Sequence, residues 1–321
     1  MMKIDAVITW VDGNDPEHKS KRLRYGPPTL FKVNDIAGST RYTSVGEIFW
    51  CVASLNRFAP WINRIFIVTD GQDPGLDEFM ATNFPDGFIP MQIVDHKEIF
   101  KGYEEVLPTF NSITIETMTW RIPDLSDRFI ELNDDMVLVS PVKPSDFFTP
   151  DGKSVCYADP YSMAWTRITR FMKPKVHGHQ QVTFKGIMYN AARIAGSRFI
   201  FYKLDHTPRA LRRDFYEKIF TERKELIMRN IRHRFRDPDQ YSAEVLQYML
   251  LSKEGLCLRR SVKGNLLYLI PKDKDGYIER KLSKLDSGNY LFCCFNSVDQ
   301  ASSDDLGRIV KWISKRLDIT L

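Results

Sequence analysis

The feature that most constrains the fold is an alternation of two hydrophobic periods along the first 140 residues. Short apolar runs typical of buried strands alternate with stretches whose apolar residues recur at helical spacing. The helical stretches are 44–58 and 112–121, and the apolar runs are Ile4–Trp10, Arg64–Thr69, Met91–Val94 and Arg128–Leu132. Alternating strands and helices predict an α/β fold with a mainly parallel sheet flanked by helices.

Three of these strands end in a turn that carries acids. The turns are Asp12-Gly13, Asp70-Gly71 and Asn133-Asp134-Asp135. Any one of them is explained by turn chemistry alone, because Asp, Asn and Gly favour tight turns. Three such turns at the ends of parallel strands favour a ligand site, since ligands bind at the carboxyl edge of open α/β sheets.

The pair Asp134-Asp135 is the predicted metal site. Two carboxylates between apolar runs can hold Mg²⁺ or Mn²⁺, with water and diphosphate oxygens as the other ligands.

Two further residues are candidates for a catalytic role. His206, before a predicted helix that starts at Pro208, could accept a proton from a hydroxyl, although a lone histidine there is more often a local hydrogen-bonding residue. Arg236 fits a phosphate clamp, since its planar fork matches phosphoryl oxygens.

The second half of the chain is less regular. We expect one long helix from Pro208 to about Arg234, another at Ser242–Lys253 and an amphipathic helix at Ser303–Leu317, with short strands at 257–262, 265–270 and 289–295. The last helix could rest on a membrane surface, but core packing is the commoner explanation of its apolar stripe. We find no repeat and no clear linker.

Charge and cysteine content limit the binding partners and the cellular compartment that we expect. The net charge of +5 is traced mainly to the stretch Arg209–Arg236, which could face lipid, a phosphate-bearing polymer or nucleic acid. Interleaved acids and few aromatic residues argue against nucleic acid. Five scattered cysteines favour a reducing compartment, and no apolar run is long enough to span a bilayer. The first residues resemble a strand more than a signal peptide, so we expect a cytoplasmic protein, with peripheral membrane association as an option.

Four blocks of residues make the chain similar to a known family. They are Ile4–Pro16; a long block from Arg41-Tyr42 through Ile115-Glu116 to Asp135; His206-Thr207-Pro208 with Arg234-Phe235-Arg236; and Cys294-Phe295-Asn296. In these blocks the chain resembles the Stealth family, which contains bacterial capsular polysaccharide phosphotransferases and the enzyme that tags animal lysosomal enzymes with GlcNAc-1-phosphate.

The resemblance implies a glycosyltransferase-A-like core and a reaction. A metal-dependent enzyme would bind a UDP-sugar-type donor such as UDP-GlcNAc, and the hydroxyl of an oligo- or polysaccharide would attack the sugar-linked phosphorus and release the nucleoside monophosphate. By carry-over, Asp134 and Asp135 hold the metal, and His206, Arg236 and Asp135 are catalytic. The expected donor-binding residues are Trp10, Asp12, Gly13, Arg41, Asn111, Ser112, Arg121 and Asn133.

We therefore predict one catalytic domain, in which residues 1–150 bind the donor and residues 151–321 complete the acceptor side. Two alternatives stay open. An ordinary glycosyltransferase would use similar acids but release the nucleoside diphosphate, whereas a basic nucleic-acid-binding protein would bind mixed DNA or RNA with a steep salt dependence.

Overall fold

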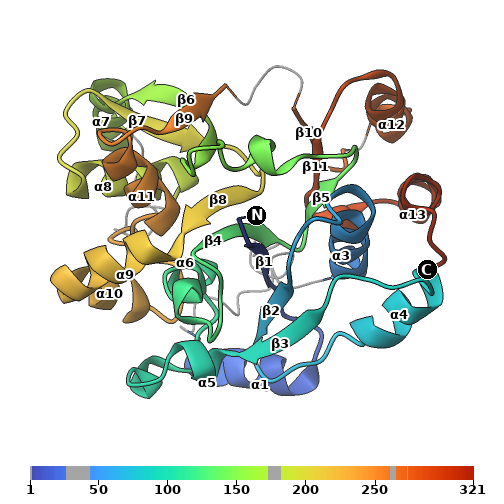
Figure 1. Ribbon diagram of the computed structural model, residues 1–321, viewed down its shortest axis with the longest axis horizontal. Coiled ribbons are helices and arrows are strands. Elements are labelled where there is room, and N and C mark those ends of the chain that lie inside the picture. The colour runs from blue at the N-terminus through green and yellow to red at the C-terminus, as the bar shows by residue number, and fades with distance from the viewer. Residues whose placement is uncertain (1, 27–43, 173–181, 261–264, 273) are drawn as a thin grey trace.

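The computed structural model describes residues 2–26, 44–172, 182–260, 265–272 and 274–321. The predicted donor residue Arg41 lies outside these ranges. The α/β architecture predicted from the sequence is confirmed, with helices on both sides of a mostly parallel central sheet (Figure 1).

The central sheet has five strands in the order β3-β2-β1-β4-β8. Strands β1 (Ile4–Thr9), β2 (Ile65–Thr69), β3 (Met91–Asp95) and β4 (Arg128–Asn133) are parallel, and each lies within a residue or two of its predicted range. Because strand order differs from sequence order, β1 sits in the middle of the sheet with β2 and β4 as its neighbours.

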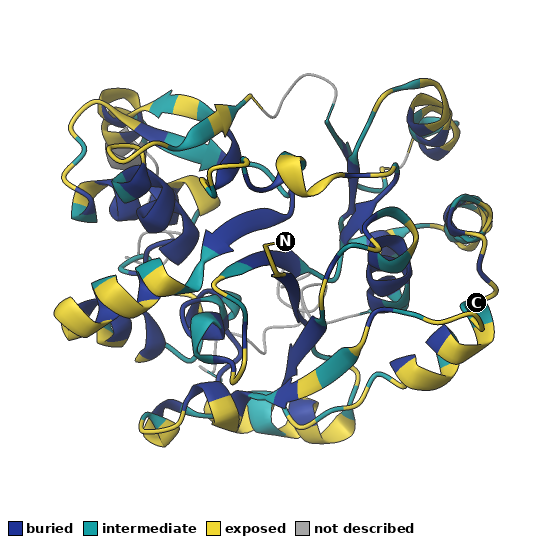
Figure 2. Cartoon of the chain, viewed as in Figure 1, coloured by how far each residue is buried: buried dark blue, intermediate teal, exposed yellow. Residues whose placement is uncertain are grey.

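Both faces of β1 are buried, as Figure 2 shows for the centre of the molecule. Alternate side chains of a strand point to opposite faces. Ile4, Ala6 and Ile8 therefore pack with α3 (Glu47–Phe58) in one apolar cluster, while Val7 belongs to the cluster on the other side. This double burial explains the mostly apolar runs in the sequence, which are typical of parallel strands.

The helix predicted from Pro208 to Arg234 is wrong. Strand β8 (Arg209–Arg212) comes first and pairs antiparallel with β4, and it is followed by two shorter helices, α9 (Arg213–Glu222) and α10 (Lys224–Ile231). Ala210 and Leu211 are buried in this pairing. The open edge of β4 thus outweighs the local helical pattern, since sheet pairing satisfies backbone groups and buries apolar surface together.

The helix predicted at 112–121 is also divided. It begins with α6 (Ser112–Glu116), capped by the Asn111 side chain, and ends in a 3₁₀ turn, η3 (Thr119–Arg121). Two other short 3₁₀ turns, η2 (Glu104–Val106) and η4 (Pro144–Asp146), lie in neighbouring loops.

Two small sheets complete the strand set. One has the order β10-β11-β5, with β10 (Leu266–Leu269), β11 (Phe292–Phe295) and β5 (Met136–Leu138); the other has the order β7-β6-β9, with β7 (Ile200–Leu204), β6 (Val155–Ser162) and β9 (Cys257–Arg259). The pairings β4–β8 and β5–β11 join the first half of the chain to the second. The single catalytic domain stays a prediction.

The remaining helices cover the sheets and the ends of the molecule. The apolar side of the last one, α13, is buried: Ile309, Ile313 and Leu317 pack in a core cluster. Core packing therefore explains its stripe. No helix within the described ranges is both long and apolar enough to cross a bilayer. The helices not yet given are α1 (Pro16–Tyr25), α4 (Leu76–Asn83), α5 (His96–Ile99), α7 (Met163–Met172), α8 (Phe184–Ile194), α11 (Ala243–Leu251), α12 (Tyr277–Ser287) and α13 (Ser303–Leu317). A further 3₁₀ turn is η5 (Val298–Gln300).

Candidate functional site

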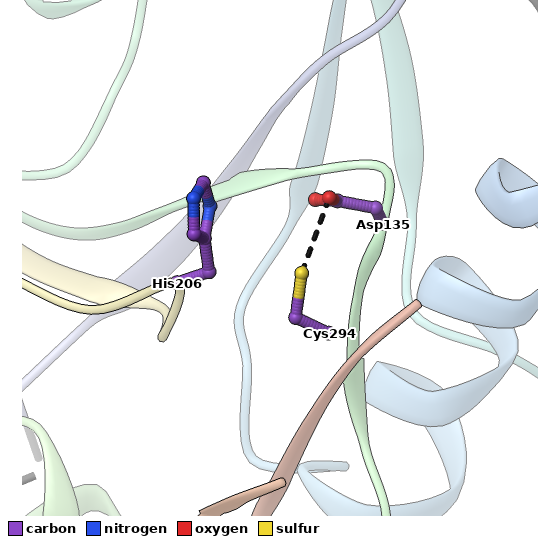
Figure 3. Close-up of side chains that lie close together, drawn as sticks. All are labelled: Asp135, His206 and Cys294. Atoms are coloured by element: carbon purple, nitrogen blue, oxygen red, sulfur yellow. Dashed lines mark hydrogen bonds between the residues drawn. The ribbon is translucent and has the colours of Figure 1, made fainter. Parts of the chain in front are cut away.

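Three side chains from distant parts of the sequence converge beside the turn that joins β4 to β5. They are Asp135 in that turn, His206 just after β7, and Cys294 in β11 (Figure 3). One potential metal-ligand atom from each lies within 4.8 Å of the others. The Cys294 thiol donates a hydrogen bond of 3.2 Å to Asp135 Oδ2, and the Asp135 oxygens face the His206 ring.

The pairing of β5 with β11 fixes Cys294 beside Asp135. Cys294 is the antiparallel partner of Met136, and the backbone N–H of Phe295 donates to the Asp135 carbonyl at 2.9 Å. The side chain of Asn296 is held nearby, with its Nδ2 at 3.5 Å from Asp135 Oδ2. The fourth sequence block is therefore part of this site, although sequence reasoning assigned it no role.

The arrangement fits a divalent cation. Asp135 Oδ1 and His206 Nδ1 are buried atoms with no hydrogen-bond partner among the described residues. Burial raises the pKa of Asp134 well above its usual range, and the nearby Asp135 and Glu47 carboxylates raise it further. A bound cation would relieve this accumulation of acids, because its positive charge favours the ionised carboxylates. Asp134 itself is not one of the three convergent residues.

His206 is suited to accept a proton. Its ring stacks on the Phe184 ring, with ring centres 5.3 Å apart. The Tyr268 ring also contacts it in a tilted arrangement, with ring centres 5.5 Å apart. Burial lowers the pKa of His206, and although Asp135 pulls in the opposite direction, the net shift is downward. The imidazole is therefore neutral at pH 7, with a lone pair available.

A second group lies on the α6 side of the site. Arg236 is exposed, and its Nη2 donates to Ser112 Oγ at 2.9 Å. Burial raises the pKa of Glu116 to about 7; Glu244 raises it, whereas Arg209 and Arg236 lower it. The same Arg236 charge acts on His206, so the arginine adjoins both groups. Glu116 was not among the predicted site residues; its only signal in the sequence was its place in the second block.

Behind Glu116 lies a buried ionic cluster. Arg209, 4% exposed, is 3.6 Å from Glu244 and 3.9 Å from Glu131. Its Nη1 also donates to Asn133 Oδ1 at 3.2 Å. Arg209 thus connects the end of β4, which carries Asn133, to the strand and helix of the second half of the chain.

Several predicted donor residues make structural contacts. The Asp12 carboxylate accepts from the Asn14 N–H at 2.8 Å, which is an Asx-turn, and its own backbone N–H donates to Gln72 Oε1 at 2.8 Å. Gly13 is buried in this turn. The Trp10 side chain is 9% exposed, and its Nε1 has no hydrogen-bond partner among the described residues.

The amide of Asn111 and the guanidinium of Arg121 are both engaged. The Asn111 Nδ2 donates to the His233 carbonyl and to Gln240, and its oxygen caps α6. Arg121 donates to the carbonyls of Ile99 and Lys101, at 2.7 Å each. Donor binding by these two residues stays a prediction, and so does donor binding by Trp10, Asp12 and Gly13.

The chain matches two models of the same family. Residues 2–27 match Stealth protein CR1, conserved region 1, and residues 41–156 match Stealth protein CR2, conserved region 2. These ranges contain the acid-bearing turns of β1, β2 and β4.

Several relatives and solved structures are similar to this chain. The capsular polysaccharide phosphotransferase LcbA of Neisseria meningitidis is 30% identical over 85% of this chain and 74% of its own length. The capsular polysaccharide phosphotransferase WcwK of Streptococcus pneumoniae is 29% identical over 93% of this chain and 91% of its own length. A crystal structure of the galactosyltransferase LgtC with donor and acceptor sugar analogues is 13% identical, with a TM-score of 0.49 over 99% and 96% of the two chains. That structural likeness carries no inference about the reaction. Two matched conserved regions and relatives of this identity show that the chain belongs to the Stealth family of enzymes.

Proposed function

We propose that this enzyme transfers a sugar phosphate from a nucleotide-sugar donor to a hydroxyl of a saccharide acceptor during polysaccharide synthesis. The observation that carries the proposal is the convergence of Asp135 and His206, within 4.8 Å, at the carboxyl end of a parallel strand. In the proposal, Asp135 is the cation-binding carboxylate and His206 is the neutral base. The relatives' names, which are polysaccharide phosphotransferases, support the reaction class.

In the proposed reaction the acceptor oxygen forms a bond to the phosphorus next to the sugar. The bond from this phosphorus to the bridging oxygen breaks, and the nucleoside monophosphate leaves with that oxygen. The hydroxyl proton passes to the His206 imidazole. In the proposal Arg236, which is exposed and donates to Ser112, orients phosphoryl oxygens. A bound Mg²⁺ or Mn²⁺ would neutralise charge on the diphosphate, with Asp134 and Asp135 as its ligands.

The rest of the site follows from these roles. Phosphoryl transfer depends mainly on positioning and charge stabilisation. The buried cluster around Arg209 matters because its hydrogen bond orients Asn133 and its charge lowers the pKa of Glu116. The donor class, a UDP-sugar such as UDP-GlcNAc, belongs to the proposal, as do donor contacts from Trp10, Asp12, Gly13, Arg41, Asn111, Ser112, Arg121 and Asn133.

The nucleic-acid alternative loses support from the contacts of the basic stretch. Arg212 pairs with Asp214 at 2.6 Å, and Arg232 pairs with Asp239 at 2.6 Å. Arg229 also pairs with Asp239, at 3.1 Å. Because these arginines have acidic partners on the same surface, the stretch is explained as a paired, solvated face.

The released nucleotide tests the proposal. The protein is incubated with Mg²⁺ or Mn²⁺, candidate nucleotide sugars and saccharide acceptors, and the nucleotide products are separated by anion-exchange chromatography. Phosphoryl transfer requires acceptor-dependent release of the nucleoside monophosphate and a phosphodiester signal in the ³¹P spectrum of the product. Exclusive release of the diphosphate would instead identify a glycosyltransferase and refute the proposal.

A further inference from the structure

A second surface, which meets the site at Phe184, combines exposed apolar side chains with positive charge. It lies at the end of the molecule formed by α7, the start of β7 and α8 (Figure 1). We call it the α7 face and define it by Trp165, Ile168, Phe184, Phe199 and Ile200. Their exposed fractions are 57%, 50%, 39%, 82% and 40%.

The fold brings these residues to one end of the molecule. Ser162, which directly precedes α7, pairs with Ile200 across the β6–β7 ladder, and the Met163 N–H donates to the Phe199 carbonyl at 2.9 Å. The first turn of α7 is therefore attached to the start of β7. Exposed single apolar residues are common, but aromatic and aliphatic side chains gathered in this way mark an interaction surface.

The charge around the α7 face indicates what binds there. The described parts of the segment 160–204 contain several Lys and Arg residues and no Asp or Glu. Arg167 and Lys185 are exposed within it, and Arg198 directly precedes Phe199. A partner with a negatively charged surface would complement this face.

We infer that the α7 face docks the enzyme on an anionic lipid bilayer. Basic residues bordering Trp, Phe and Ile are the arrangement of interfacial membrane anchors, in which apolar side chains enter the headgroup region and Lys or Arg face anionic lipids. An anionic polysaccharide would be held by the charges, but it gives no reason for Ile168, Ile200 and an 82% exposed Phe199. This inference goes beyond the proposed reaction and does not depend on it.

Docking in this way would bring the site close to the bilayer. Strand β7 runs from Ile200, on the α7 face, to Leu204, two residues before His206, and a five-residue strand is about 15 Å long. Phe184, also on the α7 face, stacks on the His206 ring at 5.3 Å. Acceptor ends presented near a membrane surface would therefore lie within reach of the proposed base.

Vesicle flotation of the full chain tests the inference. Vesicles of phosphatidylcholine alone are compared with equimolar phosphatidylcholine and phosphatidylglycerol, at low and at high salt. We expect binding only to the anionic vesicles, weakened by salt because exposed charges are screened. Trp165→Ser combined with Phe199→Ser should weaken the binding roughly tenfold or more. Arg167→Glu combined with Arg198→Glu should weaken it by at least about 25-fold, at roughly fivefold for each basic residue.

Matched variants on other surfaces serve as controls. Leu23→Ser with Ile93→Ser removes two similarly exposed apolar side chains, and Lys19→Glu with Lys97→Glu reverses two exposed charges elsewhere. These should bind vesicles like the parent, and all variants should keep the parent's melting temperature and its turnover of water-soluble substrates. Equal binding by the α7-face variants and the parent would overturn the inference. Binding to soluble polyphosphate with none to vesicles would overturn it in favour of an anionic polymer.

Discussion

Replacing Arg209 by Met should destabilise the protein strongly, because the positive charge of this arginine balances the buried carboxylates of Glu131 and Glu244. It is 4% exposed and lies near Glu244 and Glu131. Burial disfavours its charge, but the carboxylates of Glu244, Glu116 and Glu131 together raise the pKa of Arg209 above the ordinary arginine value. Met fills similar space without charge, so the variant leaves buried acids without a cation.

Removing one partner of a buried ion pair costs about 3 kcal/mol or more of unfolding free energy. With an unfolding entropy of about 2.1 cal/mol/K per residue, a loss of that size over 321 residues lowers the melting temperature by about 4 °C. The matched control is Arg212→Met on the same strand. Arg212 pairs with Asp214 at 2.6 Å, but the two side chains are 26% and 43% exposed, so its loss should cost less than about 1 kcal/mol.

The cost should also depend on pH in a defined direction. Without Arg209 the folded-state pKa values of Glu131 and Glu116, already raised by burial, rise further above their unfolded values. A carboxyl with a raised folded pKa stabilises the fold when it is protonated and loses that contribution as pH rises. The unfolding free energy that Arg209→Met loses relative to the parent should therefore be largest near pH 8 and smaller near pH 5. Urea unfolding of parent, Arg209→Met and Arg212→Met at both values measures it. Equal losses for the two variants at pH 8 would refute the reasoning.

Three other outcomes are expected. Glu116→Gln should stabilise the protein by about 1 kcal/mol at pH 8 and by much less at pH 5. The pKa of Glu116 is raised to about 7 in the folded protein, so the fold loses stability as pH rises from the ordinary glutamate value through 7; urea unfolding at the two values checks this, and a gain that is the same at both would contradict it. His206→Ala should lower kcat by about 10²-fold or more while donor affinity, measured by calorimetry, changes little; since burial lowers the pKa of His206, parent turnover should fall only as pH drops below about 6.5. Asp135→Asn should abolish metal-dependent turnover and leave the circular dichroism spectrum unchanged, and near-parental turnover would remove Asp135 from the proposed mechanism.

Strands β1, β2 and β4 could be predicted from the sequence because each is a mostly apolar, buried run that ends at a turn residue. Strand β3 could be predicted from its short apolar run, although its Ile93 is exposed. β8 could not. Arg209–Arg212 has no strand pattern of its own, and its conformation is set by pairing with β4, which is more than 70 residues earlier in the chain. Tertiary pairing of this kind is invisible to local periodicity.

The candidate site could also be predicted only in part from the sequence. Asp134 and Asp135 stood out because acids at the end of a buried strand are unusual, and His206 stood out through a short motif. Glu116 and Cys294 did not, since a glutamate on a helix and a cysteine in an apolar run are ordinary alone. They became candidates when the fold placed Glu116 against Arg209 and Arg236, and Cys294 at 3.2 Å from Asp135.

The β5–β11 pairing ties the timing of activity to the synthesis of β11. The acidic turn belongs to strands made early in synthesis, yet its Asp135 carbonyl accepts its hydrogen bond from Phe295, and Cys294 reaches its carboxylate from the same late strand. During synthesis the turn lacks these partners until the strand at 292–295 has left the ribosome. Competence for chemistry should therefore appear only then, at the point where Phe292 and Phe295 also close the core around β1 and α3.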